Sequence, residues 1–431
     1  MGKTKEERRL KEIKDPEKNW RKWGPYLSER QWGTVREDYS ENGNAWDYFT
    51  HDQARSRAYR WGEDGLAGIS DDQQLLCFAL VLWNGRDPIL KERLFGLSNS
   101  EANHGEDVKE VYYYLDNTPT HSYMKYLYKY PQTAFPYDDI VKKNHGRSRD
   151  DFEYELINTG VFNENRYFDV FVEYAKAGPE DILVEIQAAN RGPEPAELHL
   201  LPTAWFRNTW WNAPDAAKPG LEKIKAPDGS PAIALHHPEL RTRYLYAQDP
   251  LELLFTENET NMQRLFGTDN PTPYVKDGIN NYIVHGAQDA VNKGGTGTKA
   301  SVHFTRQIGA GETAVFHLRL TTISPEDFTS MGKSPLGREF EKTLAARRNE
   351  ADEFYAAITP ASLTADEKNV LRQALAGMLW GKQFYNFDLD LWLDEHGANP
   401  MSGGKKQMRN RNWSHMLNAE VISMPDKWEY P

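Results

Sequence analysis

An alternation of apolar and polar residues in the middle of the chain limits its fold more than any other feature. Because successive side chains of a strand point to opposite faces, a period of two predicts strands with one buried face. Two neighbouring segments show it, one through Phe168, Val170, Val172 and Tyr174 and the next through Ile182, Val184, Ile186 and Ala188. Further strands are predicted at 198–201, 244–247, 251–255, 300–308 and 313–321, with turns at Asn190-Arg191-Gly192-Pro193 and Gly309-Ala310-Gly311. Strands with recurring turns and few helices between them predict antiparallel sheets packed as a sandwich.

Three segments upstream are less regular. The apolar run 73–83 ends at Asn84-Gly85, a dipeptide typical of tight hairpins, so we expect a strand, a turn and a second strand. The segment 112–137 is dense in tyrosine, but prolines interrupt it, and it is therefore predicted to be a long loop. The charged residues 3–18 are predicted to form a frayed helix or tail at the surface.

Helical spacing replaces the alternation after about Thr322. Ser334-Pro335 predicts the start of a linker helix, in which Phe340, Leu344, Ala351, Phe354 and Ile358 recur at helical spacing and which Pro360 ends. Thr364 and Glu367 form a capping box that predicts a second helix. Its apolar side is expected to hold Leu371, Ala374, Leu375, Met378 and Leu379. An α domain is therefore predicted to begin near residue 363.

Length and charge exclude several classes of protein. At 431 residues the chain exceeds what one hydrophobic core usually supports, so two or more domains are expected. The net charge is −12 and the Lys and Arg residues are dispersed, which argues against nucleic acid as a partner. The N-terminus is charged where a signal peptide needs an apolar core, and no apolar run approaches the roughly 20 residues of a membrane helix. We therefore predict a cytoplasmic protein that does not contact membranes.

No motif predicts a metal ion or a cofactor. The segment 294–299, GGTGTK, resembles a phosphate loop, but Thr298 separates its last glycine from the lysine. The acidic segment 388–394 has a tryptophan where a calcium loop needs its next ligand, and the histidines that we considered lack metal-ligand spacing. Cys77, the single cysteine, lies in an apolar run and is predicted to be buried and unreactive.

The stretch 31–72 combines tryptophans with carboxylates, guanidinium groups and turn glycines. A hydroxylated ring stacks its C–H faces on aromatic side chains and forms hydrogen bonds with charged groups, so this mixture favours a sugar-binding surface. The alternative is a buried lattice of ion pairs that holds an irregular segment on a sheet. Both interpretations stay open at this point.

Four segments carry a resemblance to a known family. They are WGTVREDYSENGNAWDYFTHDQARSRAYRWGEDGLAGISD, LLFTENETNMQRLFG, GKQFYNFD and NAEVISMPDKWEYP, which begin at residues 32, 253, 381 and 418. They resemble the glucosidase-like bacterial and fungal branch of glycoside hydrolase family 63, in the six-hairpin glycosidase superfamily. The resemblance implies an antiparallel β super-sandwich, a linker helix, an (α/α)6 barrel, and inverting hydrolysis of α-linked glucosides. The expected domains are a charged tail at 1–19, the super-sandwich at 20–325, the linker region at 326–362 and the incomplete start of the barrel at 363–431.

The resemblance also implies that the catalytic carboxylates lie outside this sequence. A barrel of about twelve helices needs roughly 200 residues, whereas only one predicted helix and some loops follow Thr364. In the family, the general acid follows shortly after the segment that ends at Pro431, and the general base lies much further on. We therefore expect no catalytic residue here and no activity from this chain alone, the missing barrel being supplied in cis or in trans.

The same resemblance places residues that contact substrate. Asp426, Lys427, Trp428 and Glu429 are expected to wall a glucose subsite, Arg60, Trp61, Glu63 and Asp64 to face it from the sandwich, and Trp380 and Trp392 to stack on sugar. The alternatives are packing of Trp428 at the barrel rim, ion pairs between domains for the second group, and core packing for the other two tryptophans. A different class of protein also stays open, a sandwich that binds carbohydrate or a partner protein without catalysis.

Overall fold

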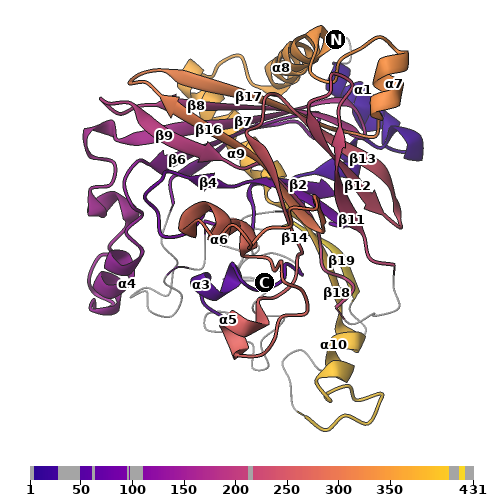
Figure 1. The fold of residues 1–431 in the computed structure, drawn as a ribbon. Helices are drawn as coiled ribbons and strands as arrows, with labels where there is room; N and C mark the ends of the chain where they lie inside the picture. The colour runs from indigo at the N-terminus through magenta and orange to yellow at the C-terminus, as the bar shows by residue number, and fades with distance from the viewer. Residues whose placement is uncertain are drawn as a thin grey trace.

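Two antiparallel β sheets packed face to face form the body of the molecule (Figure 1). The structure is a computed structural model that describes residues 4–27, 49–60, 64–94, 97, 110–211, 217–406 and 417–422. Its main hydrophobic core lies between the sheets, with Phe78 and Phe304 on one side and Val170, Val184 and Phe316 on the other. The predicted sandwich is therefore confirmed, whereas the structure leaves the barrel untested.

The first sheet has eight strands, and a central strand pairs with three others. Its strands are, in order across the sheet, β1 (Trp23–Gly24), β2 (Leu66–Asp71), β3 (Leu76–Leu80), β10 (Thr203–Phe206), β16 (Lys299–Ile308), β9 (Ala196–Leu200) and β4 (Leu82–Trp83), and β14 (Glu252–Thr256) also pairs with β16. The side chains of Cys77, Ala79 and Trp205 point to the outer face of this sheet and pack on Leu27 and Tyr59. Cys77 is buried, as predicted.

The second sheet has nine strands and is the longer layer. Its order is β15 (Thr296–Gly297), β11 (Gly220–Lys225), β12 (Pro231–His237), β13 (Leu240–Ala247), β17 (Thr313–Thr321), β8 (Asp181–Asn190), β7 (Tyr167–Gly178), β6 (Tyr123–Pro131) and β5 (Tyr112–Asn117). A separate ribbon is formed by β18 (Lys382–Asp388) and β19 (Leu417–Ile422).

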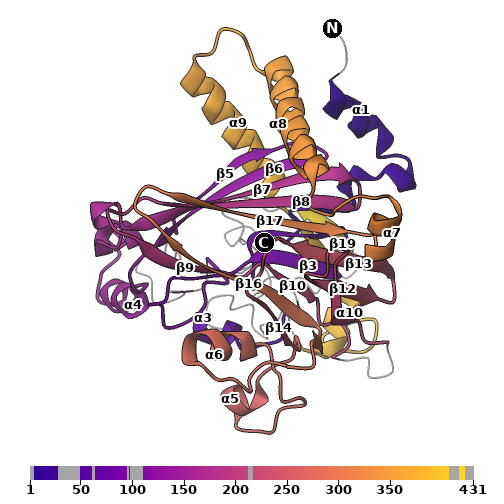
Figure 2. The ribbon, with the colours of Figure 1, turned by 45° about the horizontal axis from the view of Figure 1, so that its top comes forward.

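Helices lie around the two sheets, and α8 (Arg338–Ile358) covers the outer face of the nine-stranded sheet. They are α1 (Lys5–Glu12), α3 (His51–Ala54), α4 (Tyr137–His145), α5 (Met262–Phe266), α6 (Gly278–His285), α7 (Pro325–Ser330), α8 (Arg338–Ile358), α9 (Ala365–Trp380) and α10 (Leu389–Glu395), with 3-10 turns at Pro16–Lys18, Trp20–Lys22, Leu156–Thr159 and Asn163–Asn165. Figure 2 shows α8 and α9 on the side of the nine-stranded sheet, with α1 beside α8. None of the helices described is both long and apolar enough to cross a membrane.

The alternation predicted for the middle of the chain is confirmed. The inward side chains of β7 and β8 are the eight that the alternation predicted, and all are almost fully buried in the core. They are Phe168, Val170, Val172, Tyr174, Ile182, Val184, Ile186 and Ala188. The outward side chains of the same strands pack against α8 through Ala175, Leu183, Phe340 and Leu344. Because α8 covers this face, outward carboxylates of the two strands are also removed from water.

The turn at Gly309-Ala310-Gly311 carries the chain between the sheets. It follows β16 in the eight-stranded sheet and precedes β17 in the nine-stranded sheet, although only four residues separate the two strands. Gly311 has a φ of +73°, a conformation that glycine adopts without steric cost. This short connection ties the two layers together at one end.

Two predictions in the first third of the chain are wrong. The tyrosine-rich segment is not a loop, because β5 and β6 form a hairpin in which Tyr126, Tyr128 and Tyr130 alternate into the core. Its prolines do not interrupt the strands, since Pro119 lies in the connection and Pro131 ends β6. The second strand predicted after Asn84-Gly85 is also absent from the described residues that follow. There the chain pairs with β4 only through an isolated β-bridge between Leu82 and Lys91.

The Asn84 side chain explains the missing strand. Its Oδ1 accepts hydrogen bonds from the backbone N–H groups of Arg86 and Asp87, each at 2.9 Å. Its Nδ2 donates to the carbonyl oxygens of Pro131 and Thr133, at 2.9 and 2.8 Å. These bonds hold a wide loop against the end of β6 in place of a two-residue hairpin turn.

Both predicted helices after residue 330 are present, but the first begins later than predicted. The linker helix begins at Arg338, with Gly337 as its cap, and not at Ser334-Pro335, because the chain first makes a turn between Ser334 and Gly337. The capping box of Thr364 and Glu367 opens α9 as predicted.

The buried side of α9 differs from the predicted one. Ala376 and Trp380 are buried, whereas Ala374 and Met378 of the predicted apolar side are exposed. Tertiary contacts set which side of α9 is buried. The indole of Trp380 enters the core beside Tyr114, and Arg372 forms an ion pair with Asp116.

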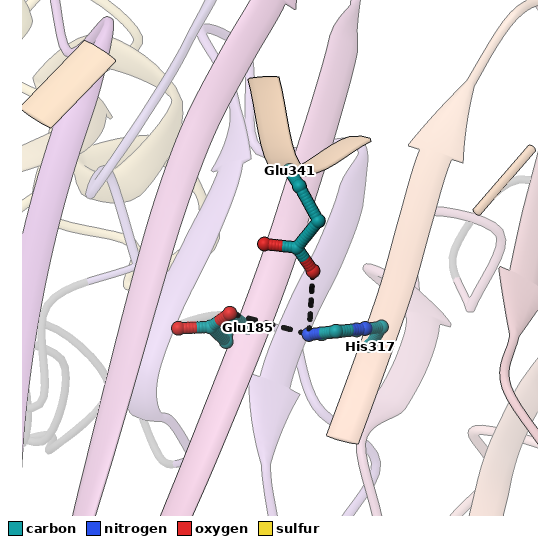
Figure 3. Close-up of side chains that lie close together, drawn as sticks. All are labelled: Glu185, His317 and Glu341. Atoms are coloured by element: carbon teal, nitrogen blue, oxygen red, sulfur yellow. Dashed lines mark hydrogen bonds and ion pairs between the residues drawn. The ribbon is translucent and has the colours of Figure 1, made fainter. Parts of the chain in front are cut away.

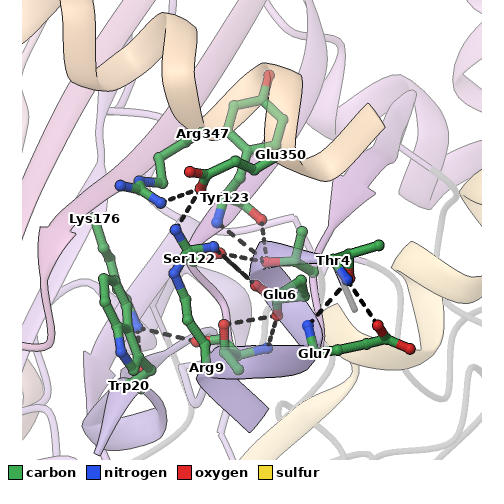
Figure 4. Close-up of polar contacts among 12 residues, drawn as sticks. Thr4, Glu6, Glu7, Arg9, Trp20, Ser122, Tyr123, Lys176, Arg347 and Glu350 are labelled. Carbon is green, nitrogen blue, oxygen red and sulfur yellow. Dashed lines mark hydrogen bonds and ion pairs between the residues drawn. The ribbon is translucent and has the colours of Figure 1, made fainter. Parts of the chain in front are cut away.

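The charged N-terminal segment is a docked helix and not a frayed one. Glu6 is fully buried beside Arg9 and Ser122 (Figure 4). Its carboxylate accepts hydrogen bonds from the backbone N–H and the hydroxyl of Thr120, at 2.7 and 2.6 Å. Arg9 forms ion pairs with Glu6 and with Glu350 of α8. Complementary charges on α8 and on the 118–122 turn therefore hold a segment whose own sequence is almost entirely polar.

Candidate functional site

The outer face of the eight-stranded sheet brings together segments that lie far apart in the sequence. Asn258, which follows β14, is fully buried and joins them. Its Oδ1 accepts a hydrogen bond from the backbone N–H of Tyr59 at 2.7 Å, and its Nδ2 donates to the carbonyl oxygens of Tyr59 and Phe206, both at 2.9 Å. Three chain segments, near residues 59, 206 and 258, are thereby held in one arrangement.

A buried ion network lies next to Asn258. Arg93 donates two hydrogen bonds to Asp64, and Lys276 contacts the other oxygen of Asp64 at 2.8 Å. Glu92 links this group to Lys299, with an N–O distance of 2.9 Å. Burial acts to raise the pKa of Asp64, but the positive charges of Lys276 and Arg93 outweigh it and lower that pKa below its ordinary value.

His51 of α3 lies near the same cations. Burial lowers the pKa of its imidazole well below the ordinary value, and the charges of Arg93 and Lys91 lower it further. His51 is therefore a neutral side chain, and its ring packs against Tyr137 with a centroid distance of 5.5 Å.

A hollow of about 280 Å³, which includes space open to solvent, lies over this network. Its lining includes Tyr59, Asp64, Trp205, Lys276 and Lys299. The enclosed part of the hollow has room for about one water molecule, so a sugar ring does not fit inside it. The network therefore agrees better with the ion-pair alternative than with a sugar subsite.

A more accessible group of side chains lies beside the network. We call it the Trp211 surface and define it as Arg60, Trp210, Trp211, Lys218, Glu257 and Glu259. Trp211 is 50% exposed, and the guanidinium carbon of Arg60 lies 3.9 Å from the centroid of its ring. The indole N–H of Trp210 donates to Glu259 at 2.6 Å, and Lys218 lies 2.9 Å from Glu257. The exposed indole of Trp211 thus contacts Arg60, and the partly buried indole of Trp210 contacts Glu259 and Lys218.

The structure places four of the predicted site residues. Arg60 belongs to the Trp211 surface and Asp64 to the buried network, so these two share one side of the molecule. Trp380 is 1% exposed, and its indole N–H donates to the carbonyl of Asp116 at 2.9 Å. Trp392 is partly buried and stacks on His396 at a centroid distance of 4.2 Å. These placements agree with core packing for Trp380. Trp61, Glu63, Asp426, Lys427, Trp428 and Glu429 lie outside the described residues.

Sequence reasoning missed most of the Trp211 surface. Trp210 and Trp211 follow a predicted strand, and Glu257 and Glu259 lie in one of the segments that carry the family resemblance. A pair of adjacent tryptophans after a strand was the available signal. Only the folded structure shows that Trp211 lies against Arg60.

Several buried carboxylates in the described part of the chain are held by cations or hydroxyl groups. Burial raises the pKa values of Asp87 and Glu110, which makes both of interest as proton donors. However, Asp87 accepts hydrogen bonds from Tyr130 and from a backbone N–H, and Glu110 accepts from Lys91 and Tyr128 at 2.7 Å. These contacts fit a structural network beneath the loop at Asn84.

One further group of ionisable side chains in the described residues has the geometry of a metal site. It consists of Glu185, His317 and Glu341. It lies on the outer face of the nine-stranded sheet, beside α8.

Comparison with curated proteins finds a relative that is similar in sequence along nearly the whole chain. No family model matches it. The Saccharomyces cerevisiae protein YMR196W, itself named as uncharacterized, is 42% identical over 468 aligned residues, and the match covers 99% of this chain and 43% of the relative. The chain therefore spans less than half the length of the curated relative that it matches.

Solved structures show only weak likeness. A galactose mutarotase related enzyme from Lactobacillus acidophilus has a TM-score of 0.24 at 7% identity, covering 57% of this chain and 94% of that one. A putative kojibiose phosphorylase from the human microbiome has a TM-score of 0.26 at 7% identity, covering 81% of this chain and 39% of that one. Scores this low carry no argument about fold or function.

Proposed function

We propose that this chain forms the β-sandwich part of an inverting glycoside hydrolase that acts on α-linked glucosides. One observation carries the proposal: segments that bear the family resemblance converge on a single face. Tyr59 belongs to the first segment and Asn258 to the second, and the side chain of Asn258 is hydrogen-bonded to the backbone of Tyr59. In the third segment, the backbone N–H of Phe384 donates a hydrogen bond to the carbonyl oxygen of Tyr26. The ring of Phe384 lies 5.2 Å from the guanidinium carbon of Arg207.

The Trp211 surface gives this face a chemistry that suits sugar. The C–H face of a pyranose packs on an exposed indole, and its hydroxyls form charge-assisted hydrogen bonds with carboxylates and guanidinium groups. Arg60, Glu259 and Lys218 are within reach of such a ring on Trp211 or Trp210. We propose that this surface contacts the substrate or orders the wall of its cleft, together with the predicted residues outside the described part.

The catalytic carboxylates are assigned elsewhere in this proposal. An inverting enzyme needs an acid and a base roughly 6.5–9.5 Å apart across the sugar. Asp64, Glu92 and Glu173 are instead each held by buried or partly buried cations. The match covers 43% of the S. cerevisiae relative, and we propose that the pair belongs to a further barrel domain of such a longer protein.

The domain boundaries and the compartment are parts of the same proposal. The linker region 326–362 contains α8, and the barrel region from 363 opens with α9. The proposed compartment is the cytoplasm. A second candidate function, a non-catalytic sandwich that binds carbohydrate or a partner, is favoured by the Trp211 surface because binding there needs no acid and base.

The test measures glucose release from a panel of α-linked glucose disaccharides. It compares the 431-residue chain with an extended protein, the full-length S. cerevisiae relative. We expect release only from the extended protein. Glucose release by the shorter chain at a normal turnover rate would overturn the assignment of the acid and base outside it.

Binding is measured in parallel by calorimetry with the same disaccharides. Trp211→Ala is expected to weaken binding by roughly tenfold or more, since an aromatic sugar contact is lost. Tyr113→Ala is the control, because Tyr113 is also a half-exposed aromatic residue but lies on β5. Equal binding by both variants would remove the Trp211 surface from the proposal. Binding without hydrolysis in either protein would favour the second candidate function.

A further inference from the structure

Three potential metal ligands meet where α8 crosses the nine-stranded sheet (Figure 3). Glu185 of β8 and His317 of β17 are direct partners across this antiparallel strand pair. Glu341 lies in the first turn of α8. The Nε2 of His317 is 3.2 Å from an oxygen of Glu185 and 3.6 Å from an oxygen of Glu341. Two rigid strands and a helix therefore direct three donor atoms to one point.

Neighbouring side chains hold two of these ligands in position. Arg348 and Gln187 both donate to Oε1 of Glu185, each at 2.7 Å, which leaves Oε2 facing His317. The imidazole of His317 packs on the ring of Phe340, with a centroid distance of 4.6 Å. Outer contacts that orient a ligand in this way are typical of metal sites. Phe340 precedes Glu341, so the residue that fixes the ring also places the third ligand.

The spacing of the donor atoms suits a small divalent ion. Ligand atoms at 2.0–2.1 Å from zinc in a tetrahedral site are separated from one another by about 3.3 Å. The two distances to His317 bracket this value, and all three donor atoms lie within 4.8 Å of one another. Glu185 is 7% exposed and Glu341 is 62% exposed, so the site has a buried floor and an open side where water completes the coordination. Two carboxylates and one imidazole favour zinc over calcium or magnesium, which bind mainly oxygen ligands.

The local charge also favours a cation. Arg348 bridges Glu185 and Glu173, and Lys125 lies 2.9 Å from Glu173. The three carboxylates Glu173, Glu185 and Glu341 and the two cations Lys125 and Arg348 therefore carry a net charge of −1.

We propose that Glu185, His317 and Glu341 bind one Zn²⁺ ion that fastens the start of α8 to the nine-stranded sheet. The sequence alone predicted no metal site, because these residues are separated by more than twenty positions and show no ligand spacing. The proposal is independent of the glycosidase proposal, since the two sites share none of their residues.

The experiment is a Zn²⁺ titration of the full chain by calorimetry, on protein that carries no histidine tag and has been treated with a chelator. We expect one ion per chain with a dissociation constant in the micromolar range or lower, and a rise in thermal midpoint on binding. Co²⁺ provides a second readout, a visible absorption band from a site that contains nitrogen and oxygen ligands.

Two variants and one control locate the bound ion. Glu341→Gln changes an exposed side chain and so keeps the fold, and His317→Gln removes the nitrogen ligand. Each is expected to lower the Zn²⁺ affinity by at least about tenfold. His236→Gln is the control, because His236 also lies beside a glutamate, Glu222, at 3.2 Å, but no third ligand joins them among the described residues. Absence of Zn²⁺ binding, or equal affinities in all four proteins, would overturn the proposal.

Discussion

The buried amino group of Lys176 makes the stability of this protein depend on pH in a way that can be calculated. Lys176 lies on β7, and its Nζ is fully buried among backbone carbonyls of the N-terminal segment (Figure 4). It donates to the carbonyl of Trp20 at 2.6 Å and also to that of Trp23. Burial lowers the pKa of this amino group from 10.5 to about 7, although the charge of Glu6 acts in the opposite direction.

The sign of the effect follows from the protons bound in each state. Between pH 7 and 10.5 the unfolded chain holds a proton on Lys176 that the folded protein has released. The free energy of unfolding therefore rises with pH across this window, and below pH 7 this group adds no further change. One pKa unit corresponds to about 1.4 kcal/mol, so the full rise is on the order of 5 kcal/mol.

The assay compares chemical denaturation of the wild type and Lys176→Met at pH 6.5, 8 and 9.5. Methionine has a similar length but no proton to lose, so the difference between the two proteins isolates this group. We expect the wild type to gain several kcal/mol relative to the variant as pH increases. Lys142→Met, at an exposed lysine on α4, is the control and should show no such change. Parallel pH curves for wild type and Lys176→Met would refute the reasoning.

Two further predictions concern buried polar groups. Asp64→Asn is expected to reduce the free energy of unfolding by about 3–5 kcal/mol, because Arg93 and Lys276 lose a buried counter-charge. Urea denaturation measures this loss, and a change below 1 kcal/mol would contradict it. Trp380→Ala is expected to cost about 3–5 kcal/mol, since it leaves a cavity and removes a hydrogen bond to Asp116. Unchanged stability with weaker sugar binding would instead support the predicted stacking of Trp380 on substrate.

Local signals were sufficient where a residue and its near neighbours decide the structure. The alternation in β7 and β8 predicted both strands and their buried faces, because side-chain direction in a strand depends only on position along it. The capping box of Thr364 and Glu367 likewise predicted the start of α9. Prolines were misleading in the β5–β6 hairpin, since their effect depends on whether the strand needs their missing N–H.

What only the tertiary structure decided is which distant segments meet. The sequence by itself determined strands, caps and a sandwich, but it did not show that β16 and β17 enter different sheets across a four-residue turn. It also did not show that Tyr59 and Asn258 share hydrogen bonds, or that Glu185, His317 and Glu341 meet beside α8. The physical reason is that periodicity is a property of neighbours along the chain, whereas burial of charge and convergence of ligands depend on contacts between segments far apart in sequence.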